Sequence, residues 1–424
     1  MTDAVTTRWK RNTVIFLTGQ TVSLFGSMVV QYAVMWYVTL DTRSGFAVAL
    51  YAIADFLPQG VVSLIGGTLA DRLNRRMLVI VSDSLTALTT LGLALLMANG
   101  IRDLWIILLA VAIRSVGAGV QTPTVQAMIP QIVPSDQLMR VNGLFQSIQS
   151  GLALLAPAFA GVVYGFFGIV PVFFVDVVTA AIGVGLLALV SVPTLTAVAE
   201  KTTTFRADLV EGWRYIAAHP FLRWLMAVFA IVMVFAGAPS FITPLMVART
   251  WGPEVWMVTV LEIAFSVGMV LGGVLVSTVF AKRSRIALIL ASSFGFAVVT
   301  SLLGLSPWLW LFYAFMFAFG LFIPLFSAPY MTLLQESVPP ERQGRVFSYV
   351  SLVMAVSTPL AMAVFGPLAD VVSVQALLIV AGAVLVVVLG VAILAPSGGR
   401  AIRAASADAS PRAAALVEEG GTRP

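Results

Sequence analysis

The sequence contains no cysteine and a single histidine, His219. Without cysteine the chain can form no disulfide and no thiolate metal site, and it has no cysteine nucleophile. One histidine in a polar stretch also argues against a histidine-rich metal site and against a Ser-His triad. The sequence has no Gly-rich Walker loop for ATP phosphates, so ATP is not the expected energy source. We therefore expect no enzyme and no bound metal.

Charge is scarce as well. Charged residues make up 10% of the 424 residues and hydrophobic residues 60%, with a mean hydropathy of +1.01. Soluble domains carry about 25% charged residues. The net charge of +5 could indicate nucleic-acid binding, but the basic residues are scattered singly and form no stripe with interleaved aromatics. The composition predicts a membrane protein with no nucleic-acid partner.

Long apolar stretches are abundant instead. A membrane-spanning helix needs roughly 20 mostly apolar residues. Twelve stretches satisfy this: about 13–40, 45–70, 77–99, 103–129, 138–168, 170–192, 220–248, 254–281, 285–304, 308–334, 342–371 and 374–395. The sequence thus predicts an all-α membrane protein whose twelve spans form two pseudo-symmetric six-helix bundles.

The polar segments divide the chain around these bundles. We expect a cytoplasmic N-terminus (1–12), a first bundle (13–192), a cytoplasmic linker (193–219), a second bundle (220–396) and a disordered cytoplasmic tail (397–424). Within the linker, four apolar residues recur at helical spacing: Phe205, Leu209, Trp213 and Ile216. Asp208, Glu211 and Arg214 take the other face. This pattern predicts an amphipathic helix on the membrane surface, or an ordinary linker helix.

The distribution of Lys and Arg predicts the orientation. If the N-terminus is cytoplasmic, 20 of the 24 Lys and Arg residues fall in inner segments, three in outer loops, and one, Arg114, inside a span. Positive residues concentrate on the cytoplasmic side of membrane proteins. We therefore expect a multi-pass protein of the cell (inner or plasma) membrane, with both termini in the cytoplasm.

The two halves of the sequence resemble each other. The segment "MIPQIVPSDQLMRVNG" precedes the fifth span and "LLQESVPPERQGRVFS" precedes the eleventh. Each contains Val-Pro, an acidic residue and then Arg-Val, and Ala160-Gly161 parallels Phe365-Gly366 further on. Duplicated six-span units are typical of transporters whose halves rock about a central site.

The segment "GGTLADRLNRR" (66–76) places unusual charge directly after the second span. Together with the 6+6 organisation it resembles the major facilitator superfamily, whose loop at this place carries G-x-x-x-D-R/K-x-G-R-R/K. The matching residues are Gly67, Asp71, Arg72, Arg75 and Arg76. Asn74 replaces the pattern's last glycine, and asparagine also tolerates a left-handed turn. The resemblance covers about 10–395.

The resemblance implies a cytoplasmic gate at this loop. Asp71 would meet the start of the eleventh span near Gly344 and Arg345, where the positive end of a helix favours an anion. The corresponding loop after the eighth span has Ser277 in the place of the acid. The basic residues recur in that loop without the acid, so the sequence predicts a latch at only the first of the two equivalent loops.

A second set of motifs narrows the resemblance. The antiporter pattern G-x8-G-x3-G-P-x2-G-G is partly matched in the fifth span by Gly143, Ala156, Pro157 and Gly161. With "EGWRYIAAHPFLR" and "MTLLQESVPPERQGRVF", it is similar to the drug:proton antiporter branch that includes macrolide-efflux and Tap-type multidrug pumps. This resemblance implies export driven by a proton gradient, with no cofactor.

Three charged residues lie near the middle of predicted spans: Asp55, Arg114 and Glu262, roughly 14, 15 and 12 Å from a span end at the helical rise per residue. A charge at this depth costs roughly 2.5–3.5 kcal/mol on insertion scales, so each needs a reason. We predict these three as proton-coupling residues. The alternative for either acid is a neutral carboxyl that holds helices together. Arg114 would balance an acid or bind an anion, or serve a purely structural pair.

Two further acids, Asp83 and Asp176, lie only about 9 Å from span ends, and we expect them to make structural bonds. Neutral polar and aromatic residues inside the spans are predicted to line the substrate cavity. The polar candidates are Gln20, Gln31, Gln121, Gln126, Gln146 and Gln149, and the aromatic ones are Trp36, Tyr37, Phe235, Phe241, Phe315 and Phe319. For any one of the aromatics, helix packing is the alternative.

These expectations combine into a monomeric secondary transporter that exports lipophilic compounds by proton antiport. Its partners would be a small lipophilic substrate, protons and the lipid bilayer. A dedicated exporter of a siderophore or other metabolite, or an importer, is the alternative within transport. A non-transporting membrane sensor or a membrane enzyme would belong to other classes of protein.

Overall fold

A computed structural model describes residues 2–190, 205–281 and 283–394. Within these ranges, the side chains of residues 2–8, 64–72, 205–209, 236, 238, 340, 341 and 344 are not described. All regular elements in the described part are helices. In chain order they are α1 (Thr2–Thr42), α2 (Gly45–Arg72), α3 (Arg75–Ala98), α4 (Leu104–Ile132), the short η1 (Ser135–Gln137), α5 (Leu138–Phe167), α6 (Ile169–Ala188), α7 (Phe205–Ala218), α8 (Pro220–Thr250), α9 (Val255–Thr278), α10 (Arg285–Gly304), α11 (Leu309–Ser337), α12 (Pro340–Val371) and α13 (Val374–Leu394).

Twelve of the described helices are long and apolar enough to cross a membrane, which confirms the predicted all-α fold. Among the described α-helices the exception is α7, which lies in the stretch where the sequence predicts a linker. Residues 193–204 of that linker and the tail 397–424 lie outside the described part. Helix α1 begins earlier than the predicted span and runs without a break from Thr2. No glycine or proline occurs in residues 2–12 to end it.

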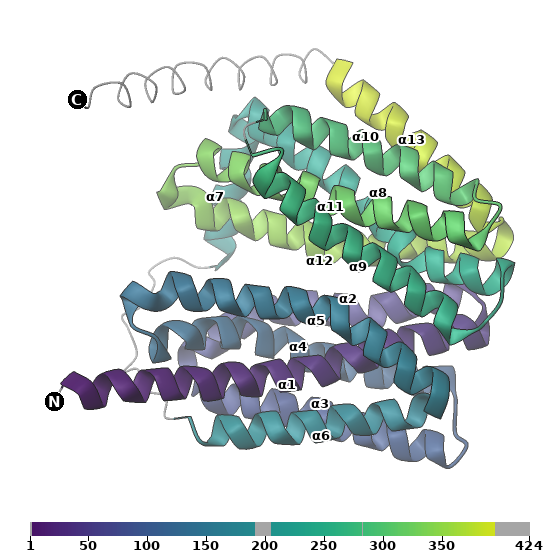
Figure 1. Cartoon of the computed structure of the whole chain (residues 1–424). Coiled ribbons are helices and arrows are strands. Elements are labelled where there is room, and N and C mark those ends of the chain that lie inside the picture. Colours follow the sequence, from purple (N-terminus) through teal and green to yellow (C-terminus); the bar gives the residue numbers. More distant parts are fainter. Residues whose placement is uncertain (1, 191–204, 282, 395–424) are drawn as a thin grey trace, which may run out of the picture.

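The helices form two bundles, α1–α6 and α8–α13 (Figure 1). In the first bundle α1 packs on α5 and α6, and α4 on α2 and α3; in the second, α11 packs on α9 and α10, and α13 on α8 and α10. The bundles meet where α2 lies against α12 and α5 against α9. We call the end where α1 begins and α7 lies the near side, and the end where α2 begins the far side.

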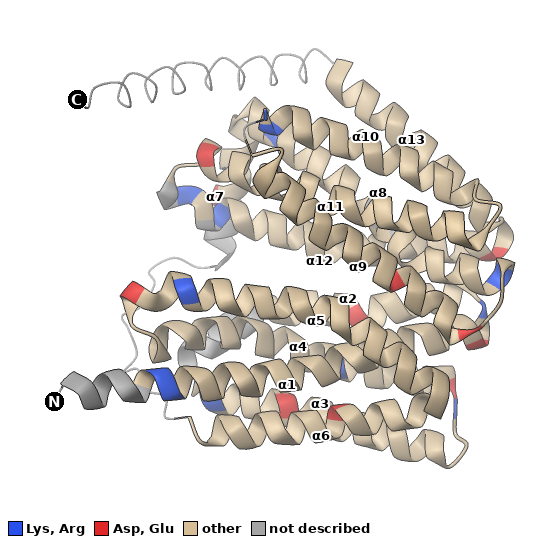
Figure 2. Ribbon diagram, viewed as in Figure 1, with Lys and Arg blue, Asp and Glu red and all other residues tan. Residues whose placement is uncertain are grey.

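The outer surface of the bundles is largely apolar, as expected for a protein that lies in a lipid bilayer. Large apolar side chains such as Leu88, Phe166 and Val387 are 63–82% exposed on the outside of the bundles. Figure 2 shows charged residues gathered at the near and far sides, with few between them. A helix that is apolar all round suits a bilayer, where lipid takes the place of a protein core.

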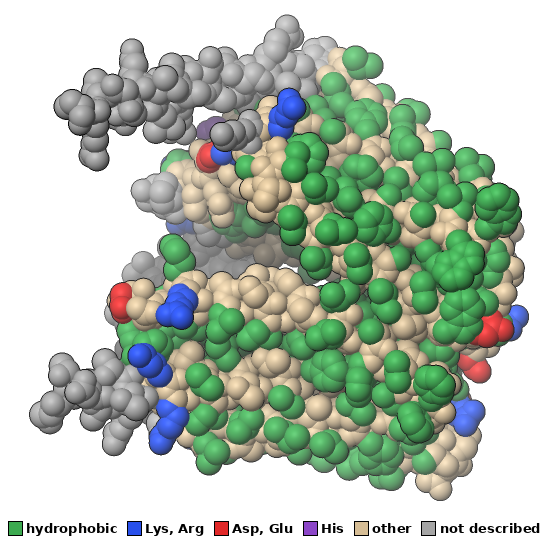
Figure 3. Space-filling view, in the orientation of Figure 1, with side chains coloured by type: hydrophobic (Ala, Val, Ile, Leu, Met, Phe, Trp, Pro, Cys, Tyr) green, Lys and Arg blue, Asp and Glu red, His purple; other side chains and the backbone are tan. Residues whose placement is uncertain are grey.

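Small residues bring particular helices close together. A Cβ added to Gly320 of α11 would strike the backbone of Phe265 in α9, and one added to Gly268 would strike the backbone of Phe317 in α11. This close approach matches the use of small residues between membrane helices, where packing has to replace the hydrophobic driving force. The space-filling view shows that the molecule is hollowed between the two bundles on the near side (Figure 3).

Candidate functional site

A cavity of about 410 Å³ lies among α1, α2, α3 and α4 of the first bundle. Its volume falls within the range of about 300–1,000 Å³ that is usual for small-molecule sites. Polar groups in its wall come from four predicted site residues, Gln31, Asp55, Arg114 and Gln121, and from Gln59 and Ser115. Apolar residues, including Met28, Val34 and Phe56, complete the lining. The mixture of apolar surface and a few polar groups is typical of a small-molecule site.

Asp55 is fixed in this wall by contacts among three helices. Its Oδ2 accepts a hydrogen bond of 2.7 Å from Nε2 of Gln31 in α1. The hydroxyl of Tyr51 donates in turn to the backbone oxygen of Gln31 at 2.9 Å. The hydroxyl of Ser115 in α4 donates to the backbone oxygen of Asp55. The carboxyl is therefore held at the cavity by a neutral amide, and no described ion pair involves it.

Arg114 reaches from the cavity wall into the bundle, where it forms an ion pair with Asp176 of α6. It also donates to the hydroxyl of Thr90 in α3. The Asp176 side chain is 0% exposed and accepts further hydrogen bonds from Ser27 at 3.1 Å and Thr90 at 2.8 Å. Asp176 thus balances the charge of Arg114 within one bundle and ties α1, α3, α4 and α6 together.

Asp83 forms a second buried acid cluster nearby. Its Oδ1 accepts hydrogen bonds from Ser23 in α1 at 3.0 Å and from Nε2 of Gln121 in α4 at 2.6 Å. Its Oδ2 is buried and has no hydrogen-bond partner in the described structure. These bonds hold α3 against α1 and α4, and Gln121 connects the cluster to the cavity wall.

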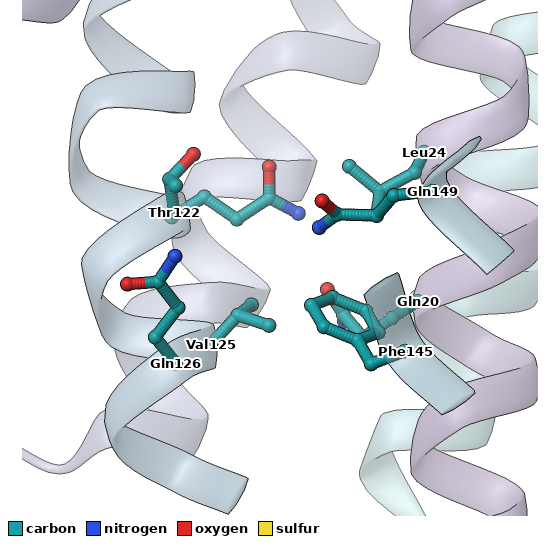
Figure 4. A pocket seen from close by; sticks show the side chains of 8 residues that line it. Gln20, Leu24, Thr122, Val125, Gln126, Phe145 and Gln149 are labelled. Atoms are coloured by element: carbon teal, nitrogen blue, oxygen red, sulfur yellow. The ribbon is translucent and has the colours of Figure 1, made fainter. Parts of the chain in front are cut away.

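A smaller pocket, of about 30 Å³, continues from the cavity towards the near side between α1, α4 and α5. Figure 4 shows Gln126 and Gln149 reaching into it from opposite walls. Gln20 also lines it, and neither polar atom of its buried amide has a partner among the described groups. Of the two candidate glutamines in α5, Gln149 lines this pocket, whereas Gln146 is exposed and lines neither pocket.

Glu262 lies apart from the cavity, in α9 of the second bundle. It is 7% exposed, and its carboxylate has no hydrogen bond or ion pair among the described residues. One turn later, Ser266 donates to the backbone oxygen of Ala153 in α5 at 3.4 Å. The structure therefore places Asp55 and Glu262 in opposite bundles, with Glu262 beside the interface between them.

The predicted aromatic residues take different places. Phe241 of α8 packs edge-to-face on Phe56 of the cavity wall, with ring centroids 5.8 Å apart. Phe235 contacts Phe365 of α12. The remaining candidates lie in helix packing: Trp36, Phe319 and Tyr37 are buried and Phe315 is partly buried.

The described part of the charged loop makes contacts inside the first bundle. Arg75 donates to the backbone oxygen of Ala127 in α4 at 2.7 Å, and Arg76 donates to that of Ala188 in α6. Arg345, at the start of α12, pairs with Glu211 of α7 at 2.7 Å. The side chains at the other predicted gate positions, Gly67, Asp71, Arg72 and Gly344, lie outside the described part.

Asn74 has a different role from the one expected. Its φ is −63°, so the backbone does not take the left-handed turn that glycine in the family pattern suggests. Its side chain instead accepts a hydrogen bond from the backbone N–H of Met77 and caps the N-terminus of α3. Asparagine is among the best residues for this position, because its oxygen satisfies a free N–H of the first turn.

The antiporter motif lies along the contact between the bundles. Ala156, Pro157 and Gly161 of α5 are buried. A Cβ on Gly161 would overlap the side chain of Thr259 in α9. Gly143, by contrast, has no atom within 4 Å of its missing Cβ. Only the later part of the motif therefore contributes to the close approach of the bundles.

Several site residues were not predicted from the sequence. Gln59 lies one helical turn after Asp55, and this i,i+4 spacing could have identified it. Tyr51 also lies one turn before Asp55 on the same face. The pairing of Arg114 with Asp176 had no such signal, since it joins residues 62 positions apart.

Twelve helices able to span a membrane in two bundles, with a polar cavity inside the first and a hollow between them, are typical of a membrane transport protein. The sequence matches the Major Facilitator Superfamily over residues 16–358, with a second match over 251–418. The chain belongs to this superfamily and is one of its transporters.

Similar proteins agree with this assignment. Macrolide efflux protein A of Streptococcus pyogenes is 29% identical over 355 residues, which cover 83% of this chain and 88% of that protein. Macrolide efflux protein A of Enterococcus faecalis is 28% identical over 312 residues, covering 73% of this chain and 97% of the relative. The crystal structure of the nucleoside transporter NupG matches with a TM-score of 0.72 at 13% identity, covering 90% of this chain and 98% of NupG.

Proposed function

We propose that this transporter exports lipophilic compounds in exchange for protons, by alternating access of a central site to the two sides of the membrane. The observation that carries the proposal is Asp55, an ionisable carboxyl held by a neutral amide in the wall of a cavity of drug-binding size. A carboxyl that gains or loses a proton beside the substrate can couple the binding of the proton to the binding of the substrate. Protons are then the energy source, and neither a cofactor nor a catalytic step is needed.

The orientation allows a substrate to be loaded from the cytoplasm. By the concentration of Lys and Arg, we assign the near side to the cytoplasm and both termini with it. The hollow between the bundles then opens to the cytoplasm (Figure 3), while the far side is closed by contacts between α2, α8 and α12. An exporter loads its substrate from this state. Drugs dissolved in the inner leaflet or the cytoplasm would reach the cavity from here.

The chemistry of the cavity favours a lipophilic substrate. Phe56, Met28 and Val34 offer apolar surface, and the amides of Gln31, Gln59 and Gln121 offer hydrogen bonds without net charge. The charge of Arg114 is balanced by Asp176. The two similar macrolide efflux proteins support this class of substrate, and we propose that a monomer in the lipid bilayer is sufficient for transport.

The proton carrier can be tested directly. Purified protein in proteoliposomes with an imposed pH gradient should show gradient-dependent movement of a macrolide or another lipophilic drug. Asp55→Asn together with Glu262→Gln should abolish the dependence on the gradient while drug binding persists. Asp136→Asn, an exposed near-side acid, is the matched control and should behave like the wild type.

The outcomes separate the two parts of the proposal. Gradient-driven transport that survives the double substitution would refute the assignment of the carrier. The absence of gradient-dependent flux for any of a chemically diverse set of drugs would contradict proton-coupled drug export itself and favour a dedicated exporter of one metabolite.

A further inference from the structure

Asp370 is the second-last residue of α12, and its side chain contacts the first bundle on the far side. Its Oδ1 accepts a hydrogen bond from the backbone N–H of Gly45 at 2.7 Å. Its Oδ2 accepts from the N–H of Phe46 and from the hydroxyl of Ser44, both at 2.9 Å. The carboxylate of one bundle thus caps the N-terminus of α2 in the other, where free N–H groups and the helix dipole favour an anion.

Arg249, in the last turn of α8, completes the connection. Its Nη2 pairs with Oδ1 of Asp370 at 2.6 Å. It also donates twice to the backbone oxygen of Arg43, from Nε at 2.9 Å and from Nη2 at 2.6 Å, and to the backbone oxygen of Ala369. Both ionic side chains are less than a third exposed. One arginine therefore binds α12 and the first bundle at the same time.

The backbone around this cluster is adapted to the contact. Among the described residues, Arg43 is the only non-glycine residue with a positive φ, 48°, and its carbonyl is the one that Arg249 binds. Strained positions of this kind persist where the surrounding contacts require them, often at functional sites. Gly45 and Gly366 allow α2 and α12 to approach so closely that a Cβ on either would strike the backbone of the other.

We propose that Asp370 and Arg249 form a latch between the bundles, which holds the far side closed in this conformation and opens in every transport cycle. The far-side latch consists of these two side chains and the backbone of residues 43–46. In the orientation proposed above, it is the outer gate. Exchange of substrate with the far side, in either direction, requires the two bundles to separate here, so all of these hydrogen bonds must break together.

The far-side latch would complement the cytoplasmic gate that the family resemblance implies. In that gate, Asp71 at the end of α2 would face the start of α12 on the near side. On the far side the relation is inverted, because an acid at the end of α12 meets the start of α2. Each of the two helices would then carry the acid that fastens one side of the transporter. The inference needs only the transporter class, and depends neither on proton coupling nor on the direction of transport.

The absence of cysteine allows a direct test by spin labelling of paired cysteines. Arg102→Cys with Trp308→Cys reports the far-side separation of the bundles, and Met139→Cys with Arg283→Cys reports the near-side separation. All four positions are exposed and lie outside the latch. Distances would be measured by double electron–electron resonance on protein in lipid nanodiscs. Asp370→Asn should raise the ratio of far-open to far-closed molecules by roughly five- to a hundredfold, the usual size of a coupling between sites.

Three variants distinguish a latch from a general loss of structure. Asp103 caps α4 through the N–H of Trp105 at 2.8 Å, but lies within one bundle. Asp103→Asn therefore removes similar chemistry and should leave both distances unchanged. Asp370→Glu keeps the charge and the acceptor atoms, and should recover most of the closed population. A double variant that combines Asp370→Arg with Arg249→Asp again has opposite charges at these two positions. Because a guanidinium accepts no hydrogen bond from Gly45 or Phe46, this variant should recover the closed population only in part.

Unchanged far-side distances in Asp370→Asn would overturn the proposal. So would an equal change in Asp103→Asn, since the effect would then not require a contact between the bundles. Thermal unfolding of every variant shows whether it is folded. If Asp370→Asn is unfolded, Arg249→Lys applies the same test, because lysine keeps the charge but cannot bind Asp370 and two backbone oxygens in the same planar geometry.

Discussion

Replacing Arg114 by methionine should strongly destabilise the first bundle, because it leaves a buried carboxylate without its counter-charge. Asp176 is 0% exposed and retains only two hydroxyl donors, Ser27 and Thr90. Removing one partner of a buried ion pair costs about 3–5 kcal/mol of unfolding free energy. Since both hydroxyls can still donate to Asp176, we expect the lower end, about 3 kcal/mol, which is more than a hundredfold in the folding equilibrium.

Two related variants should differ from Arg114→Met in their unfolding free energy. Asp176→Asn should cost less, because the remaining charge on Arg114 is 12% exposed and lines a cavity that admits water. The double variant Arg114→Met with Asp176→Leu removes both charges and should return close to wild-type stability, since apolar replacement of a buried pair is often neutral or stabilising. Thr90 keeps a hydrogen bond to the backbone oxygen of Thr86 at 2.9 Å in this background.

The measurement is unfolding of the purified proteins in one detergent, followed by fluorescence of the chain's nine tryptophans. We expect wild type and the double variant to be the most stable, Asp176→Asn to be less stable, and Arg114→Met to be the least stable. A double variant as unstable as Arg114→Met would refute this expectation, because the loss would then come from packing around the long arginine side chain rather than from an uncompensated charge.

Three further predictions concern the motifs. Gly161→Val should still insert into the membrane but transport poorly, since the new side chain would overlap Thr259. Gly143→Ala places its methyl group in open space and should transport normally. Equal transport by the two variants would show that close packing at Gly161 is not required. Asn74→Ala should lower the unfolding free energy by about 0.5–2 kcal/mol through loss of the cap on α3, and Asn74→Asp should retain it. Asp71→Asn should insert normally but transport poorly, and normal flux in proteoliposomes would leave this loop only a role in topology.

Much of the fold could be predicted from the sequence because membrane insertion depends on local properties. The length of an apolar stretch and the nearby Lys and Arg residues act before any tertiary contact forms. The helix boundaries mostly agree with the predicted spans to within a few residues. Helix α1 is the exception, since a polar N-terminal segment without glycine or proline simply continues the helix.

The site was harder to predict, because its residues meet across helices. The sequence identified Asp55, Arg114 and Gln121 as polar residues in spans, and the structure brings them to one cavity. It gave no means of pairing Arg114 with Asp176, or of preferring Gln149 over Gln146. Which face of a helix points inwards depends on its rotation in the bundle, and a helix that is apolar all round carries little information about that rotation.

The chain's own residues determined the membrane class, the number of spans and the superfamily motifs, because each depends on composition or on short spacings along the chain. The tertiary structure decided which charges neutralise one another, which glycines face another helix, and where the two bundles are fastened. Asp370 illustrates the difference: in the sequence it is one acid near the end of a span, 325 residues from Gly45. Only packing of α2 against α12 brings that carboxylate to a free helix N-terminus, because the contact exists only between the two bundles.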